Sequence, residues 1–484
     1  MKKIEIQIRC KELPADTVTP VGIYLRLRDR FPGCLLLESS DSHAAQNSYS
    51  FICVKPVAGI RVEKTDNGFS RTLNCPGEAA QTASIERAEI PGTLDEYLRS
   101  FELKGEVPVK AAAGLFGFTS YDAVQAFETI SLRDRETKSN LPLLRYDLFR
   151  YVIAIDHFYD RLFICENLCD GENPETEEIE TLIGNKNIPV FPFALQGEES
   201  SNFTDAEYLE LVDKARAHCR RGDVFQLVFS RRFRRTFTGD EFNVYRALRS
   251  INPSPYLFYF DYGSYKIFGS SPEAQLQIDG GKAIIHPIAG TFRRTGNEQA
   301  DRALAEKLLL DPKENAEHVM LVDLARNDLS RHSNEVQVDS FREIQYYSHV
   351  IHLVSKVSGK LENSDRPFRL LADTFPAGTL TGAPKYKAME LADRYENVSR
   401  SFYGGCIGFA GFGGDFNHAI VIRSFLSEQN TLTYQAGAGI VAQSEPQSEL
   451  MEVSHKLNAL RAALDKAPRL FANAKAEKYI VQPQ

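Results

Sequence analysis

Apolar residues are distributed along the chain in a pattern that predicts strands for most of the first two hundred residues. One helix is expected from Pro20 to about Arg30, because Thr19 can cap its start and proline fits the first helical position. The acidic run Asp170–Glu178 indicates the approach to a domain boundary near 195–203. The predicted strands, rich in β-branched and aromatic residues, are Cys34–Glu38, Tyr49–Val54 and Tyr151–Asp156.

Beyond the boundary, helical and alternating patterns mix. A capping box, Thr204 to Glu207, precedes apolar residues at helical spacing and predicts a helix from about 205 to 220. Gly280-Gly281 separates two alternating runs and predicts a hairpin. A second set of strands is expected at Gly404–Phe412, Ala419–Phe425 and Thr431–Ala436, and further helices at about 312–330, 384–396 and 446–464.

These elements indicate an α+β fold in which antiparallel sheets carry helices on their outer faces, because strands joined by short turns must run antiparallel. We expect two large domains, 1–200 and 201–468, and a C-terminal tail over 469–484.

Composition narrows the class of protein. The 484 residues are 43% hydrophobic and 25% charged, as in ordinary globular chains. A net charge of −8 disfavours a dedicated nucleic-acid binder, which usually carries a basic excess. No signal peptide or membrane-spanning run is visible, and the eight cysteines are scattered, so we expect a reduced cytoplasmic protein without a membrane. Tryptophan is absent.

Two predicted helices each carry an E-x-x-E pair near their start. Glu314 and Glu317 follow Pro312, and Glu449 and Glu452 follow Pro446. Taken singly, such a pair usually belongs to a solvated helix face. If the four carboxylates converge, they suit Mg²⁺, which prefers oxygen ligands and keeps waters that a substrate anion can displace.

Two glycine-rich segments could receive an anion. The segment 375–385 ends in a helix start, where loop amides and the helix N-terminus point outward. Gly437 and Gly439 follow a predicted strand and would allow close approach of backbone N–H groups to a ligand. Ordinary turn glycines are the default explanation of both segments, and neither matches a Walker A or dinucleotide fingerprint.

Several isolated polar residues have both a structural and a functional interpretation. His352 lies in an apolar stretch, where a core histidine is the default and proton transfer the alternative. Glu273 follows a turn and could act as a general acid if burial raised its pKa. Arg423 lies in a predicted strand, where it either binds a carboxylate or forms an ion pair. The cluster at 231–235, with four arginines, is expected to be the exposed face of a strand.

Taken together and in order, these segments resemble the chorismate-utilising enzymes, among them the large subunit, or component I, of anthranilate synthase. The resemblance is dense over 201–465 and thinner before it. The N-terminal part carries LLLESSD (35–41) and GLFGFTSYD (114–122). The later motifs are PIAGT (287–291), AEHVMLVDLARNDL (316–329), GTLTGAPK (378–385), YGGCIGF (403–409), IVIRS (420–424), QAGAG (435–439) and PQSE (446–449).

The resemblance implies two interlocked domains in an α/β sandwich that uses Mg²⁺ to turn chorismate and ammonia into anthranilate and pyruvate. It implies Glu314 and Glu449 as principal Mg²⁺ ligands, with Glu317 and Glu452 as companions. Glu273 corresponds to the proposed general acid, and His352 to a histidine linked to later proton abstraction. The residues implied to contact substrate are Thr379, Gln226, Gly290, Thr291, Tyr403, Arg423, Gly437 and Gly439.

Two positions separate members of this family. Where isochorismate and salicylate synthases carry a water-activating lysine, this chain carries Gln226, so ammonia is the expected nucleophile. Many aminodeoxychorismate synthases have a lysine at the position of Ala289, which cannot form a covalent amine adduct. An aminodeoxychorismate or aminodeoxyisochorismate synthase remains the alternative function.

The resemblance also implies partners and regulation. The chain lacks a Gly-x-Cys-x-Gly glutaminase elbow, so ammonia would come from a separate glutamine amidotransferase subunit, component II, in a heterodimer or heterotetramer. Feedback by tryptophan is implied, and a catalytically silent tryptophan-sensing subunit is the non-enzymatic alternative. The implied tryptophan-pocket residues are Glu38, Ser39, Pro255, Tyr256 and Leu257.

Overall fold

Long antiparallel strands form the centre of the computed structural model. It describes residues 1–39, 48–105, 107–133, 135, 141–169, 171–346, 350–362 and 366–472. Among these residues, every strand pairing is antiparallel except that of β1 with β6. The mixture of helices and antiparallel strands confirms the predicted α+β class.

Strands outweigh helices in the first two hundred residues, as predicted. Their helical segments are α1 (Pro20–Leu27), η1 (Arg87–Glu89), α2 (Ile90–Leu98), η2 (Lys110–Ala112), η3 (Tyr121–Ala123), α3 (Val124–Phe127) and α4 (Thr176–Ile183). Their strands are β1 (Ile4–Pro14), β2 (Leu35–Glu38), β3 (Tyr49–Thr65), β4 (Gly68–Asn74), β5 (Gln81–Ile85), β6 (Phe101–Lys104), β7 (Gly114–Thr119), β8 (Leu144–Asp156), β9 (Arg161–Cys169) and β10 (Phe193–Ser201).

The remainder mixes helices with strands. The helices are α5 (Asp205–Arg221), α6 (Phe242–Ile251), α7 (Glu298–Leu310), α8 (Pro312–Ser330), α9 (Pro367–Thr374), α10 (Gly378–Thr381), α11 (Lys385–Tyr395) and α12 (Pro446–Ala472). The strands are β11 (Gln226–Gly239), β12 (Tyr256–Asp261), β13 (Tyr265–Ser271), β14 (Ala274–Asp279), β15 (Lys282–Ile285), β16 (Ile288–Arg293), β17 (Ser333–Tyr346), β18 (Val350–Leu361), β19 (Gly382–Ala383), β20 (Cys406–Gly411), β21 (Phe416–Ile420), β22 (Ser424–Glu428) and β23 (Thr431–Ile440).

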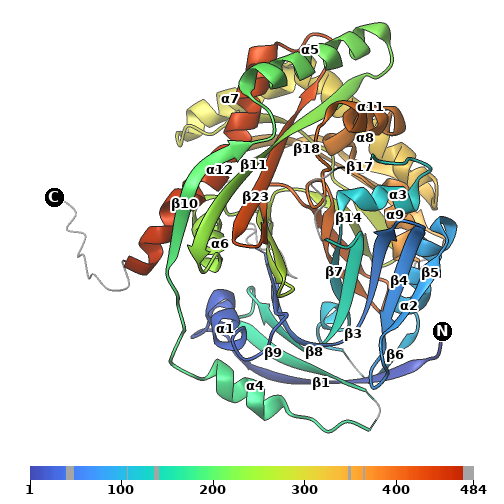
Figure 1. Cartoon of the computed structure of the whole chain (residues 1–484), viewed down its shortest axis with the longest axis vertical. Coiled ribbons are helices and arrows are strands. Elements are labelled where there is room, and N and C mark those ends of the chain that lie inside the picture. The colour runs from blue at the N-terminus through green and yellow to red at the C-terminus, as the bar shows by residue number, and fades with distance from the viewer. Residues whose placement is uncertain are drawn as a thin grey trace.

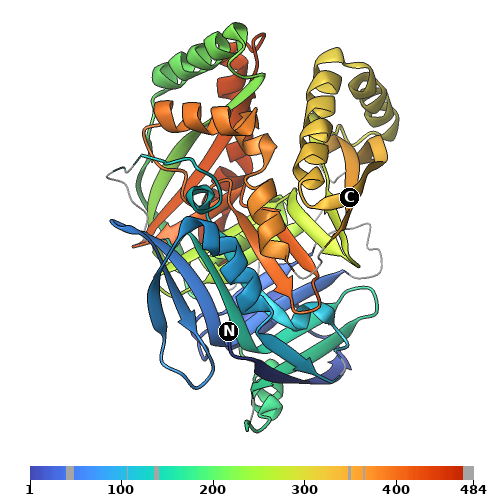
Figure 2. The same cartoon turned by 90° about the vertical axis from the view of Figure 1, so that its right-hand side faces the viewer.

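The two parts of the chain share their sheets. β2 pairs with β12, and β7 pairs with β20, so strands from the first two hundred residues lie between strands of the later part. In Figure 1 the N-terminal strands β1, β8 and β9 lie below β11 and β23. Figure 2 shows α7 and α8, in yellow, on one side of the upper part and α5 and α12 on the other. The predicted site residues on α8 and those on α12 therefore come from opposite sides of the upper part.

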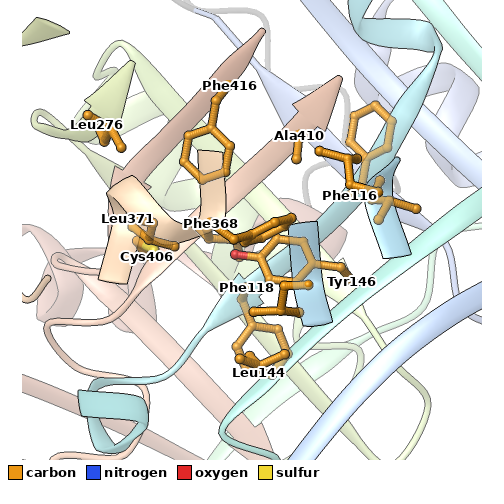
Figure 3. Packing of buried hydrophobic residues seen from close by; sticks show 14 of the residues in the cluster. Phe116, Phe118, Leu144, Tyr146, Leu276, Phe368, Leu371, Cys406, Ala410 and Phe416 are labelled. Carbon is orange, nitrogen blue, oxygen red and sulfur yellow. The ribbon is translucent and has the colours of Figure 1, made fainter. Parts of the chain in front are cut away.

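Two large apolar clusters fill the space between the layers. One contains Phe116, Tyr146, Phe368 and Phe416, with aromatic rings from both parts of the chain packed together (Figure 3). The other lies under α5, α6 and α12. The shared clusters stabilise the interlocked arrangement, since burying large apolar side chains is the main favourable contribution to folding.

The predicted helix starts are confirmed at atomic level. Thr19 Oγ1 accepts a hydrogen bond of 3.0 Å from Gly22 N at the start of α1. At α5, Thr204 and Glu207 form the predicted capping box. The hairpin at Gly280-Gly281 joins β14 to β15.

Three predictions need correction. The expected strand Ala419–Phe425 is split into β21 and β22, because Arg423 has a φ of 49° and turns the chain between them. Gly437 and Gly439 lie inside β23 rather than after a strand. We expected reduced cysteines, whereas Cys10 on β1 lies opposite Cys165 on β9 and is joined to it by a disulfide.

The predicted boundaries fall inside regular elements. Residue 200 lies within β10, which pairs with β11, and residue 469 lies within α12, which continues to Ala472. Residues 473–484 of the predicted tail lie outside the described residues. No helix in the described part of the chain is long and apolar enough to cross a membrane.

Candidate active site

Glu273 and Thr379 meet between the β13–β14 turn and the short helix α10. Thr379 Oγ1 donates a hydrogen bond of 3.0 Å to Glu273 Oε1. Burial raises the pKa of Glu273 to about 7, although the Thr379 hydrogen bond and the charges of Arg423 and Lys456 act in the opposite direction. Glu273 is thus a carboxyl group that can hold a proton near neutral pH, as a general acid must.

Arg423 is held in a left-handed backbone conformation beside this acid. Its carbonyl oxygen accepts a hydrogen bond from Ser270 N at 3.2 Å, which fixes the chain between β21 and β22. Its guanidinium makes no hydrogen bond or ion pair with the residues that the structure describes, and burial lowers its pKa. A partly buried guanidinium without a protein partner favours the binding of an anion over a structural role.

His352 lies on β18 against a bulge of β16. The register shifts between Ala289 and Thr291, so Gly290 bulges out with a φ of 68°. His352 Nδ1 lies 3.1 Å from the Gly290 carbonyl oxygen, which can only accept, so Nδ1 carries the hydrogen and the lone pair is on Nε2. Burial lowers the pKa of His352 to about 4, so the ring is neutral at pH 7 and can accept a proton. The side chain of Thr291 lies outside the described part.

The start of α8 brings Glu314 to the same bulge. Asp311 Oδ1 accepts a hydrogen bond of 3.1 Å from Glu314 N and so caps the start of the helix. A Cβ atom on Gly290 would lie 3.2 Å from Glu314 Oε2 and 2.7 Å from the Leu308 side chain. Glycine is therefore required at 290 both for its backbone conformation and for the approach of this carboxylate.

Gln226, at the start of β11, connects α8 with β23. Its Nε2 donates to Glu317 Oε1 at 3.0 Å. A Cβ atom on Gly439 would lie 2.7 Å from the same nitrogen, so a larger residue at 439 would displace the amide. The structure therefore brings together three predicted site residues that lie far apart in the sequence.

The first turns of α12 contribute the second glutamate pair. Glu449 is only 4% exposed, and Glu452 forms an ion pair of 2.8 Å with Lys456. Lys456 Nζ also donates to the Gly437 carbonyl oxygen at 2.8 Å. We did not predict Lys456 as a site residue, although it shares a helix face with the two glutamates; that spacing was the available signal.

Tyr403 lies in the turn before β20. Its side chain is 4% exposed, and burial raises the pKa of its hydroxyl, which therefore stays protonated and can donate. The Gly437 backbone faces this hydroxyl, so Tyr403 belongs to the same group as Arg423 and the β23 glycines.

The four glutamates predicted to bind a metal ion would offer it carboxylate oxygens. No group of three or more His, Cys, Asp or Glu side chains in the described ranges is arranged to hold a metal. Glu314 and Glu449 come from the starts of two different helices, and such a site with one or two carboxylates fits Mg²⁺, which takes its remaining ligands from water and substrate anions. It does not fit Zn²⁺, which prefers closed sets of nitrogen and sulfur ligands.

The predicted tryptophan-pocket residues form a separate group. Glu38 on β2 lies opposite Leu257 on β12, and the two strands therefore bring together segments that are more than two hundred residues apart. The Glu38 side chain is buried and accepts hydrogen bonds from Tyr245 at 2.5 Å and Arg249 at 3.0 Å. Burial raises the pKa of Glu38, against the effect of Arg249. The neighbouring pocket candidates Ser39, Pro255 and Tyr256 are partly exposed.

The arginine cluster of β11 is not a simple exposed face. Arg232 is 4% exposed and donates to Gln435 Oε1 at 3.0 Å and to the Arg400 carbonyl oxygen at 3.2 Å. The prediction of an exposed face is thus wrong for Arg232, because its guanidinium is buried against Gln435 and the Arg400 carbonyl oxygen. Arg234 is exposed, as expected.

The chain is similar to known proteins over most of its length. The family model described as chorismate binding enzyme matches residues 33–462. The chain is 36% identical over 480 residues to anthranilate synthase component 1 of Aquifex aeolicus (strain VF5), covering 94% of each chain. It is 37% identical over 484 residues to the protein of that name in Arthrobacter globiformis, covering 94% of this chain and 90% of the relative. The crystal structure of anthranilate synthase component I from Streptococcus pneumoniae TIGR4 matches with a TM-score of 0.74 and 30% identity over 93% of this chain and 99% of that one.

Proposed function

Since this chain belongs to the chorismate binding enzyme family, we propose that it is the large subunit of an anthranilate synthase. It converts chorismate and ammonia to anthranilate, pyruvate and water, the first committed step of tryptophan synthesis. The observation that carries this proposal is the grouping of a carboxyl group that is protonated near neutral pH, a neutral histidine and a guanidinium without a protein partner.

Substrate binding uses the cationic and glycine-rich parts of the site. Arg423 offers a planar fork to the enolpyruvyl carboxylate, and the Tyr403 hydroxyl donates to the same group. The absence of side chains at Gly437 and Gly439 lets the substrate approach the backbone of β23 closely. Lys456, fixed by Gly437 and Glu452, adds a positive charge at this end.

Glu314 and Glu449 would hold Mg²⁺, with Glu317 and Glu452 beside them. When bound, the ion neutralises the ring carboxylate of chorismate and makes the neighbouring ring position more electrophilic. Gln226 holds Glu317 in place through its amide.

The chemistry begins with addition of ammonia to the ring and departure of the ring hydroxyl. Glu273 gives its proton to that hydroxyl, the C–O bond breaks and water leaves. Gln226 has no basic group with which to activate water, so ammonia rather than hydroxide adds. His352 then accepts the ring proton at Nε2, and pyruvate is eliminated as the ring becomes aromatic.

Ammonia would come from a separate glutamine amidotransferase subunit, and tryptophan would inhibit through the pocket at Glu38 and Leu257. Glu38 and Leu257 lie on β2 and β12, and β12 pairs with β13, which leads to the turn that carries Glu273. A bound ligand could therefore shift the acid through two paired strands.

Product analysis tests the proposal. Purified protein is incubated with chorismate, ammonium chloride and Mg²⁺, and the products are separated by chromatography. Anthranilate and pyruvate in equal amounts are expected. Accumulation of an aminated compound that retains the enolpyruvyl group would instead identify an aminodeoxychorismate or aminodeoxyisochorismate synthase, and unchanged chorismate would identify a silent subunit. With glutamine as the only nitrogen source, we expect no product.

A further inference from the structure

A small cavity is lined by Glu273 and by residues, among them Gln275 and Asp328, that have no role in the proposed mechanism. Its volume is about 40 Å³. Its lining includes Glu273, Thr379 and Ile420, together with residues of α8, of the end of α9 and of the segments before β16 and before α10. Since a buried water needs roughly 10–15 Å³ of such space, the cavity has room for more than one water molecule.

One residue of the lining carries a buried polar atom that has no hydrogen-bond partner among the described residues. Gln275 is 3% exposed and lines the cavity. Its Nε2 donates to the Thr374 carbonyl oxygen at 3.3 Å, which fixes the orientation of the amide. Its Oε1 has no hydrogen-bond partner within the part of the chain that the structure describes. A buried amide oxygen without a donor is costly, so a donor from solvent is expected there.

The backbone turns Gln275 toward this place. The pairing of β14 with β21 shifts register between Ala274 and Leu276, so Gln275 is the extra residue of a bulge. Bulges redirect a side chain and occur often beside active sites. Gln275 is only two residues after Glu273. The bulge therefore brings the acid and the amide without a hydrogen-bond partner into one short segment.

Further polar groups line the same cavity. Asp328 also lines the cavity, and its carboxylate accepts a hydrogen bond of 2.7 Å from Lys385 Nζ. The same ammonium group donates to the Thr374 carbonyl oxygen. His286 also lines the cavity and is itself partly exposed to solvent. Acceptor oxygens thus surround a small space, which suits water as a molecule with two donor hydrogens.

We propose that this cavity holds ordered water that returns protons to Glu273 and receives the water released from the substrate ring. The inference rests on the proposed function. When Glu273 gives its proton to the ring hydroxyl, the C–O bond breaks with its electron pair on oxygen, and a carboxylate remains. That carboxylate needs one proton from solvent before the next turnover, while the substrate side of the acid is covered by substrate and product.

Two variants and one control test the inference. Gln275→Leu removes the acceptor oxygen without adding bulk, and Ala325→Val places two further methyl groups at the α8 wall of the cavity. Ala305→Val on α7 is the control, because Ala305 and Ala325 are each 4% exposed and Ala305 does not line the cavity. The melting temperatures of all three variants show whether they fold. If Ala325→Val does not fold, Gln275→Leu alone still tests the inference.

The ammonia-dependent reaction is measured in H₂O and in D₂O. Both cavity variants are expected to lower kcat about tenfold, which is part of the hundredfold or more that a general acid contributes. KM for chorismate should change less than twofold, and the solvent isotope effect on kcat should increase. Values within twofold of the Ala305→Val control would overturn the inference. If wild-type protein does not turn over chorismate, the proposed function fails instead.

A crystal structure provides a readout independent of activity. At high resolution, we expect at least one ordered water within hydrogen-bond distance of Gln275 Oε1, and its loss in Gln275→Leu. A cavity without ordered water in the wild-type crystal would overturn the inference whatever the kinetics.

Discussion

The Arg400 guanidinium and the Glu396 carboxylate form a buried ion pair beneath the predicted substrate site, with Nη2 and Oε1 2.7 Å apart. Arg400 also donates to the carbonyl oxygens of Leu380 and Val228, at 2.6 Å and 2.8 Å. Leu380 follows Thr379, and Val228 pairs with Gly439. One ion pair therefore holds two backbone segments that carry site residues.

Arg400→Met is expected to destabilise the protein by about 3–5 kcal/mol, because it leaves Glu396 buried without its cation. Urea unfolding measures the change. The control is Lys214→Met, which removes an exposed pair with Glu210 and should cost less than about 1 kcal/mol. Similar losses in the two variants would contradict the central role of Arg400.

The pH dependence of turnover should follow the protonation of Glu273. Its acid form is the active one, so kcat/KM for chorismate, measured at constant free ammonia, is expected to fall as pH rises through about 7. Thr379→Val removes a hydrogen bond that lowers the pKa of Glu273. The pH at which kcat/KM falls should therefore be higher in this variant. Thr379→Ser keeps the hydroxyl, so the pH at which kcat/KM falls should not change. A fall of kcat/KM at lower pH in the valine variant would contradict the assignment of Glu273 as the group that must be protonated.

The same carboxyl group should affect stability. Its pKa in the folded state lies above the value of 4.5 typical of the unfolded chain, so its contribution to stability is present at low pH and is lost as pH rises through about 7. Glu273→Gln, which cannot ionise, is expected to melt at a higher temperature than wild type at pH 8 and at the same temperature at pH 5. Equal melting temperatures at both pH values would show that Glu273 is not buried enough to matter.

Arg423→Gln should weaken binding of chorismate. Losing a charged hydrogen bond costs about 1.5–3 kcal/mol, so KM should rise roughly tenfold to a hundredfold. Arg423 has no protein partner among the described residues, so the variant should keep the melting temperature of wild type within a few degrees. A large loss of stability with unchanged KM would indicate a structural arginine instead.

Much of the fold could be predicted from local patterns. The Thr19 and Thr204 caps and the Gly280-Gly281 hairpin depend on residues close in sequence, and the structure confirms all three. Arg423 was predicted inside a strand because its neighbours are apolar and alternate. Its left-handed conformation depends on the hydrogen bond from Ser270, more than one hundred and fifty residues earlier, which no local pattern reveals.

The site shows the same limit. The family resemblance singled out Glu273 and His352 as candidates, but their protonation depends on burial and on contacts with Thr379 and Gly290 from other elements. The bulge at Gln275 arises from the register of β14 against β21, and the sequence contains no signal for it. Side-chain chemistry can be read from motifs, whereas pKa values and bulges follow from long-range packing.

Formation of anthranilate by the purified chain tests the central claim most directly. The protein contains no tryptophan, so the fluorescence of anthranilate can be followed against a low protein background. With chorismate, ammonium and Mg²⁺, we predict a steady increase for wild type, none after chelation by EDTA, and a loss of at least about a hundredfold in Glu273→Gln. Absence of anthranilate from folded wild-type protein, or formation that EDTA does not affect, would contradict the account.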